Sequence, residues 1–338
     1  MSGVELLVRN ALEASPLFRP LAPEGARLPE APAPQWRGLS LVVPSPPALS
    51  ANDLLARLAE LRRQLADRRR RVQGEPVALG DDVQVRMVGY ARGRLIPGAV
   101  RYEEWIELTP DDDLPGFAEQ LAGTPVGSSA RVSTTHRGER AEYIVDVLDA
   151  CAVTPLDDDS PELLDRLGRG STLDAVMASL AADVEEERSE WCRRELRERA
   201  IDELAVRVRV EVPPQLLREE IRRRWMEREG RRLAWLGLDA DEQQSALQGW
   251  MEDDTVVIQV DRSVRAYLAL SAIAREERLQ PDFSSWFDSL AEITREPRES
   301  IRSTIVRDRT LSARLAEVAT QAAALDLVMS HASIAAGD

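Results

Sequence analysis

Helical spacing begins just after residue 50, where apolar side chains recur at intervals of three and four residues. The stripe consists of Leu54, Leu55, Leu58, Leu61 and Leu65. This spacing places apolar side chains on one face of a helix, and Ser50 and Asn52 are suitable N-cap residues. The basic run Arg68–Arg71 would continue the helix as a solvated end favoured by the helix dipole, with nucleic-acid contact as the alternative.

The chain before this helix is rich in proline, with nine prolines from Pro16 to Pro47. Proline fixes φ and removes a backbone donor, so we expect extended chain here rather than helix. One short strand is expected within Trp36–Val43, where apolar side chains gather.

Between Gly80 and Val153 the apolar period changes from a helical one to a period of two. Alternation is clear in Val83–Val88, Ala130–Ser133 and Tyr143–Val147, and glycines punctuate the segments between them. Alternating strands bounded by glycine turns predict a compact, mostly antiparallel β domain.

After Pro155 the pattern is helical to the end of the chain. Pro213 and Pro214 separate two of the helices, and Val256–Ala274 is apolar on nearly every side, which predicts a central helix. Helices are expected over residues 173–191 with a continuation to 208, 216–225, 256–274, 283–294 and 299–329. The fold class is therefore α+β and multidomain, with a small antiparallel β domain and a large, elongated all-α domain.

The composition of the chain mainly indicates which partners and cofactors are not expected. Acidic residues outnumber basic ones by 59 to 44, which gives a net charge of −15, and every basic residue of that count is an arginine. Phosphate neutralisation needs a basic face, so nucleic acid is not expected as a partner. The two cysteines and two histidines match no zinc or redox spacing, so we expect no metal and no cofactor.

Targeting signals are missing from the sequence as well. Residues 1–20 lack a basic start followed by an apolar run, and no apolar run approaches the ~20 residues that span a bilayer. We therefore expect a cytoplasmic protein with no membrane partner.

Two stretches resemble a known family. Gly80–Val83, Leu114–Gly123 and Val126–Ser128 resemble the FKBP-type prolyl-isomerase domain, in which a Gly-Asp start, an apolar-Pro-Gly-Phe turn and a following glycine recur. Val212–Ile221, with the residues Val-Pro-Pro-Gln-Leu-Leu-Arg-Glu-Glu-Ile, resembles a helix start in the C-terminal domain of trigger factor. The order of the parts along the chain also resembles that of the trigger factor family.

The resemblance implies four segments. Residues 1–33 are a short divergent N-terminal segment, and 34–76 form a linker strand and helix that pack with the helical domain. Residues 77–153 are an FKBP-like domain, and 154–338 form a helical chaperone domain. Trigger factors carry a ribosome-binding domain with a Gly-Phe-Arg-x-Gly-Lys loop, which is absent here, so ribosome binding by the family's route is not expected.

The same resemblance implies a pocket for an X-Pro peptide. Its candidate residues are Met87, Trp105, Leu114, Phe117 and Tyr143. The flap that covers this pocket in the family is missing, because only Thr134–Glu139 fills the space, and Met87 replaces an aromatic residue. These side chains could equally form the core of a small β domain, so isomerase activity is expected to be weak or lost.

A second set of candidates lies in the helical part, where trigger factors hold unfolded chains. Arg231–Leu238 is apolar, ends in glycine and leucine and lies between helices, which favours an exposed tip. The candidate client-binding residues are Trp225, Leu233, Trp235 and Leu236. Tryptophan and methionine suit contact surfaces of low specificity.

Three functions remain open from the sequence. The first is an ATP-independent chaperone that holds unfolded or nascent polypeptide in a helical cradle, with a vestigial prolyl-isomerase domain. The second is an active peptidyl-prolyl isomerase. The third is an assembly factor or adaptor dedicated to one specific partner.

Overall fold

The computed structural model describes residues 7–8, 28–43, 45, 48–110, 114–157, 160–280 and 283–336. The chain divides into two compact units that are not contiguous in sequence. One comprises Met1–Pro46, Glu190–Arg223 and Asp254–Asp338, and the other comprises Pro47–Ser189 and Arg224–Asp253. The expected domains follow one another along the chain, with a boundary at residue 154. Each of these two units instead combines segments that are far apart in sequence. Most of the expected N-terminal segment, residues 1–33, lies outside the described residues.

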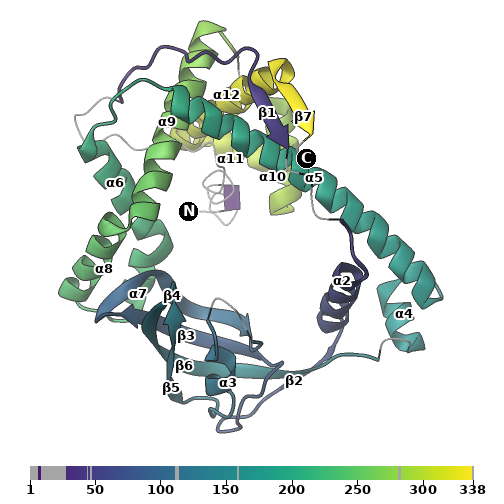
Figure 1. The fold of residues 1–338 in the computed structure, drawn as a ribbon. Coiled ribbons are helices and arrows are strands. Elements are labelled where there is room, and N and C mark those ends of the chain that lie inside the picture. Colours follow the sequence, from purple (N-terminus) through teal and green to yellow (C-terminus); the bar gives the residue numbers. More distant parts are fainter. Residues whose placement is uncertain are drawn as a thin grey trace. The chain divides into compact units, whose positions relative to one another are not determined.

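An antiparallel sheet forms the centre of the second unit, as the period of two predicts. Its strands are β2 (Asp67–Arg70), β3 (Asp82–Ala91), β4 (Arg94–Glu107), β5 (Ser129–His136) and β6 (Glu139–Thr154). The order is β2-β6-β3-β4, and β5 also pairs with β6 (Figure 1). We call residues 67–154 the sheet domain. The short helix α3 (Phe117–Leu121) packs beside β5.

The basic run Arg68–Arg71 does not continue a helix, so that prediction is wrong. Residues of β2 pair with the end of β6, from Asp67 opposite Thr154 to Arg70 opposite Cys151. Each arginine meets a carboxylate, and Arg71 pairs with both Glu75 and Asp81, at 2.7 and 2.5 Å. Strand pairing with β6 satisfies the backbone groups of β2, and the carboxylates compensate the charges of its arginines.

The expected helix after residue 50 is α2 (Ala51–Gln64). Ser50 caps it by accepting a hydrogen bond from the backbone N–H of Asp53, and the Asp53 carboxylate accepts one from the backbone N–H of Ser50. This reciprocal pair is a capping box. Leu58 on its apolar face is buried against helix α4 (Pro161–Leu167) and the start of α5 (Leu173–Arg207).

Helices dominate the first unit. They are the second part of α5, most of α6 (Pro214–Trp225), α9 (Asp254–Glu276), α10 (Phe283–Thr294), α11 (Arg298–Arg307) and α12 (Arg309–His331). The short strands β1 (Ser40–Val43) and β7 (Ser333–Ala336) pair in parallel beside them. Helix α9 is buried along much of its length, which confirms the prediction of a central helix. No helix within the described ranges is long and apolar enough to cross a membrane.

The helix expected over residues 299–329 is interrupted at Asp308. Its backbone is extended, with φ −100° and ψ 106°, and its carboxylate accepts hydrogen bonds from the N–H groups of Thr310 and Leu311. Asp308 therefore ends α11 and caps α12. Apolar spacing continues across the break, which is why periodicity alone predicted a single helix.

A helical segment of the second unit lies against the sheet domain. We call Arg224–Asp253 the arm segment; it contains the π-helix η1 (Met226–Gly230), α7 (Arg231–Trp235) and α8 (Ala240–Glu252). Both α7 and α8 pack against β4 (Figure 1). Gly237 has a φ of +76°, a value that suits glycine, where the chain turns from α7 into α8.

Candidate functional site

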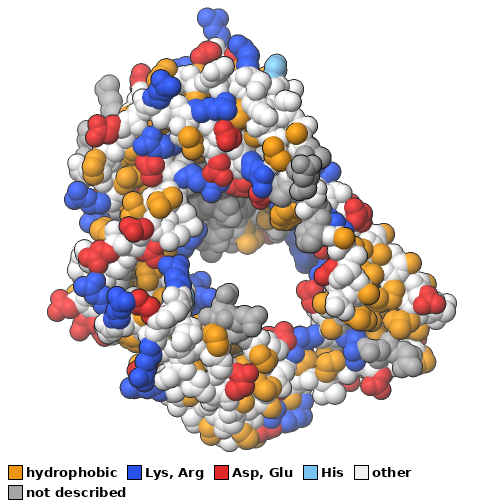
Figure 2. Space-filling model, viewed as in Figure 1, with side chains coloured by type: hydrophobic (Ala, Val, Ile, Leu, Met, Phe, Trp, Pro, Cys, Tyr) orange, Lys and Arg blue, Asp and Glu red, His pale blue; other side chains and the backbone are white. Residues whose placement is uncertain are grey.

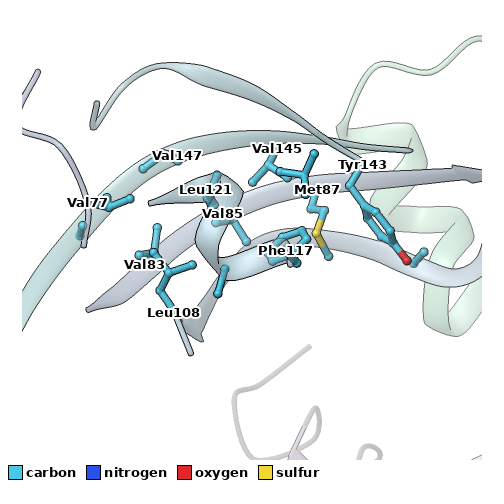
Figure 3. Close-up of a cluster of buried hydrophobic side chains, with 14 of the residues drawn as sticks. Val77, Val83, Val85, Met87, Leu108, Phe117, Leu121, Tyr143, Val145 and Val147 are labelled. Carbon is cyan, nitrogen blue, oxygen red and sulfur yellow. The ribbon is translucent and has the colours of Figure 1, made fainter. Parts of the chain in front are cut away.

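Three of the expected pocket residues lie together inside the sheet domain. Met87, Phe117 and Tyr143 are exposed by only 6%, 6% and 2%, and they belong to one apolar core (Figure 3). The rings of Phe117 and Tyr143 meet edge to face with centroids 5.8 Å apart. These side chains fill the core rather than line an open pocket.

The other two pocket candidates lie differently. Leu114 is partly buried against the same core. Trp105 is 47% exposed and pairs across the strands with Gln84, whereas the neighbouring pair Val83 and Ile106 points into the core. Because successive side chains of a strand point to opposite faces, Trp105 lies on the other face of the sheet from Phe117. The structure therefore does not bring Trp105 to the expected pocket.

A tight hairpin occupies the position of the family's flap, which the sequence is expected to lack. Strands β5 and β6 are joined by Arg137 and Gly138, both with positive φ, at 51° and 80°. Thr134 donates a hydrogen bond through Oγ1 to the carbonyl of Pro115 at 2.7 Å, which fastens β5 to the turn before α3. Positive φ at both turn residues is the geometry of a two-residue hairpin, so this segment contains no long loop.

The expected client-binding residues of the arm segment divide into two groups. Trp225 and Leu233 are 4% and 0% exposed, so the expectation that they face a client is not met in this conformation. Leu233 belongs to α7, which packs on β4 instead of ending in solvent. Trp235 is 63% exposed and its ring meets that of Tyr102 at 5.3 Å between centroids, while Leu236 is half-buried.

A buried carboxyl group lies where the arm segment meets β4. Glu229, in the π-helix η1, is only 2% exposed. Its Oε2 accepts a hydrogen bond from Nε1 of Trp250 at 2.5 Å, and its Oε1 accepts one from the backbone N–H of Gly98 at 3.1 Å. The carboxyl group thus joins η1, α8 and β4. Sequence reasoning missed it, because a glutamate between two arginine-rich stretches resembles a solvated residue.

Burial raises the pKa of Glu229 from 4.5 to about 7. Loss of hydration disfavours the charged form, and this outweighs the opposing effects of the two hydrogen bonds and of Arg232 and Arg101. The group therefore exchanges a proton close to neutral pH.

Strand β4 is shaped for this contact. Val88 pairs with Val100 but Tyr90 pairs with Leu95, so β4 bulges between these pairs, and Gly98 within the bulge has a φ of +80°. On the arm segment, a Cβ at Gly249 would lie 3.7 Å from the carbonyl oxygen of Leu95, which shows how closely α8 approaches the strand. A bulge frees backbone groups from the ladder, and here one of them binds Glu229.

A further apolar surface lies on α2, α4 and the start of α5. Around the buried residues Leu58, Val176 and Leu180, several large side chains are only partly buried. They are Leu54, Leu61, Leu164, Leu167, Leu173 and Met177, with Leu55 beside them at 56% exposure. We call this set the leucine patch. Orange side chains gather over the same elements in Figure 2. The apolar stripe of α2 was visible in the sequence, but its incomplete covering was not.

Clusters of three or more histidine, cysteine, aspartate or glutamate side chains that could hold a metal ion do not occur among the described residues.

Comparisons with known proteins place these features in a family context. Residues 172–330 match the model of the bacterial trigger factor protein C-terminus. The trigger factor of Shouchella clausii is 25% identical over 295 residues, which cover 81% of this chain and 66% of that protein. The trigger factor of a Geobacter species is 26% identical over 292 residues, which cover 81% of this chain and 65% of that protein. The chain thus spans slightly less than two thirds of these relatives.

A solved trigger factor chaperone structure, from work on its promiscuous substrate recognition in folding and assembly, has a TM-score of 0.37 and 17% identity. The match covers 90% of this chain and 73% of that chain. Residues 172–330 therefore resemble the C-terminal part of bacterial trigger factors, and most of the chain is similar in sequence to these proteins, at 25–26% identity.

Proposed function

We propose that this protein is an ATP-independent chaperone that holds unfolded or newly made polypeptide on apolar surfaces, as its relationship to trigger factors implies. The leucine patch carries the proposal, because it presents several partly exposed leucines and one methionine on one side of a small helical cluster. We expect the protein to act in the cytoplasm, and the prolyl-isomerase activity of its sheet domain to be weak or lost.

The physical basis of holding is apolar area removed from water. Burial yields ~25 cal/mol per Å², so contact over a few hundred Å² gives capture that is weak and reversible without nucleotide. The methionine side chain adapts to partners of different shape, which suits clients of unrelated sequence. Charges such as the ion pair of Arg57 with Glu187, at 2.6 Å, border this helical cluster.

The test replaces one exposed and one partly buried side chain of the patch. The variant Leu55→Ser with Met177→Ser should weaken suppression of the aggregation of a chemically unfolded client. Val206→Ser is the matched control, because Val206 is 84% exposed on α5 outside the patch. The control should hold clients as well as the parent chain does.

A melting curve accompanies both variants, since Met177 is partly buried and its loss also affects folding. Reduced holding at unchanged melting temperature supports the proposal. Equal loss in the patch variant and in Val206→Ser would contradict a role for this patch, and a parent chain that never suppresses aggregation would contradict the chaperone function itself.

The two alternatives make different predictions. An active prolyl isomerase would accelerate cis-trans exchange in a proline peptide, which otherwise takes ~10–100 s. The packing of Met87, Phe117 and Tyr143 as core supports slow turnover instead. A dedicated assembly factor would recover one partner in a pull-down, whereas a general chaperone would recover many.

A further inference from the structure

The arm segment is joined to the sheet domain by polar and charged contacts as well as apolar ones. Besides the hydrogen bonds of Glu229, Arg94 of β4 pairs with Glu252 of α8 at 2.8 Å. Arg137, in the β5–β6 turn, pairs with Asp253 at 3.2 Å. Hydrogen bonds and ion pairs exchange with water more readily than apolar packing does, so this contact is suited to separate and reform.

Apolar side chains lie on both sides of the same contact. Leu233, Leu247 and Trp250 of the arm segment are at most 5% exposed, and Leu95 and Val100 of β4 are at most 7% exposed. We expect separation of the arm segment from β4 to hydrate part of this surface.

We propose that the arm segment is a detachable clasp, fastened to β4 through the buried carboxyl group of Glu229, and that its release presents a second apolar surface to unfolded polypeptide. This inference rests on the proposed function, because it names how one client surface of the chaperone is covered and uncovered.

Two local features of the closed arm segment are unusual. The segment Met226–Gly230 is a π-helix, a form that is rare and found mostly at functional sites. Trp225, 4% exposed, has an indole Nε1 with no hydrogen-bond partner in the described part of the chain. A buried donor without an acceptor disfavours the closed arrangement relative to one in which water reaches it.

The proton on Glu229 sets the direction of the switch. In the closed clasp its pKa is about 7, and in the released arm we expect it to return toward 4.5. The closed form therefore binds more protons. Closure is strongest below pH ~4.5, the pKa expected for Glu229 in the released arm, and is lost as pH rises to about 7. Across the whole interval between these two pKa values, the equilibrium constant for opening changes by about 300-fold. Arg232 of α7 and Arg101 of β4 are the charged groups that oppose this shift.

Hydrogen exchange of the full chain measures this opening directly. The protection of α8 amides, corrected for the intrinsic pH dependence of exchange, should fall by up to about tenfold per pH unit between pH 5 and 7 and then level off. In Glu229→Gln it should not change with pH. Glu227→Gln, which neutralises an exposed carboxyl on the same π-helix, should behave like the parent.

Amides of β3, in the middle of the sheet, report complete unfolding and must stay more protected than those of α8. Two outcomes overturn the clasp. One is pH-independent protection of α8 in the parent chain, and the other is equal protection of α8 and β3, because the arm segment would then open only when the sheet unfolds.

A disulfide that locks the arm segment to β4 tests whether release of the arm segment contributes to client holding. A Cβ at Gly249 would lie 3.9 Å from Cγ of Pro97, so Gly249→Cys with Pro97→Cys should form a disulfide when Cys151 and Cys192 are replaced by serine. The oxidised protein should hold clients less well than the same protein after reduction, and failure of the bond to form contradicts the contact.

The outcomes separate the two proposals. Equal holding in the oxidised and reduced states overturns the clasp but leaves the chaperone function intact. No holding in either state, together with none in the parent, overturns the proposed function instead.

Discussion

The carboxyl group of Glu229 accepts a hydrogen bond from the indole of Trp250 at 2.5 Å, with both side chains at most 5% exposed. The backbone N–H of Gly98 donates to the other oxygen of the same group. A single side chain therefore ties a π-helix and a neighbouring helix to a strand that lies more than a hundred residues earlier in the chain. Several predictions about stability depend on this arrangement.

The stability of the parent chain relative to Glu229→Gln should fall as pH rises from 5 to 8. Burial raises the folded-state pKa of Glu229 to about 7, above its unfolded value, so the folded state binds the proton more tightly. This contribution is fully present below pH ~4.5 and is lost as pH rises through about 7, and the part lost between pH 5 and 8 is about 2 to 3 kcal/mol. Urea unfolding of both proteins at the two pH values measures it, and an unchanged difference would contradict the burial of an ionisable group here.

Trp250→Phe should be strongly destabilising, by about 2–4 kcal/mol, because it shrinks a buried side chain and removes the donor to Glu229. Trp235→Phe is the matched control. Trp235 is 63% exposed, and its contact with Tyr102 predicts a loss of no more than about 1 kcal/mol. Thermal melts of the two variants compare the costs, and similar values for both would show that Trp250 is not a core residue.

Two glycines of the arm segment should respond oppositely to alanine. A Cβ at Gly230 would lie 2.9 Å from Cζ3 of Trp225, so Gly230→Ala should cost about 1–3 kcal/mol. At Gly249 the nearest atom is the carbonyl oxygen of Leu95 at 3.7 Å, an ordinary contact, so Gly249→Ala should stabilise α8 by up to about 1 kcal/mol. Opposite shifts in melting temperature are expected, and a loss in both would mean that α8 lies closer to β4 than described.

Phe117 should matter for folding but not for holding clients. It is 6% exposed in the core of the sheet domain, where Phe117→Ala would cost about 3–5 kcal/mol. Phe117→Leu keeps most of the volume and should cost only about 1–2 kcal/mol. Suppression of aggregation should equal that of the parent at a temperature where both are folded. A large loss of holding at intact fold would assign this region to client binding.

The exposed end of the arm segment should contribute to holding without contributing to stability. Trp235→Ser with Leu236→Ser removes a largely exposed ring and a half-buried leucine, so it should cost about 1 kcal/mol or less. Aggregation suppression should weaken, whereas Val206→Ser should leave it unchanged. A strongly lowered melting temperature would show that these side chains are core.

Local patterns along the sequence predicted much of the fold. Alternation predicted the antiparallel sheet, and spacing predicted α2, α9 and α10 with boundaries close to those observed. The Ser50 cap was also readable, because it depends only on residues within one turn. These features are local, so neighbouring residues suffice to determine them.

Tertiary structure decided what each element packs against. Arg68–Arg71 became a strand because β6 supplied its ladder and distant carboxylates paired its charges, and no local pattern encodes either partner. Glu229 acquired its raised pKa, and Leu233 of α7 was buried, where the arm segment docks on β4. Periodicity tells which face of a helix is apolar, but the partner that removes water from that face is brought by the rest of the chain.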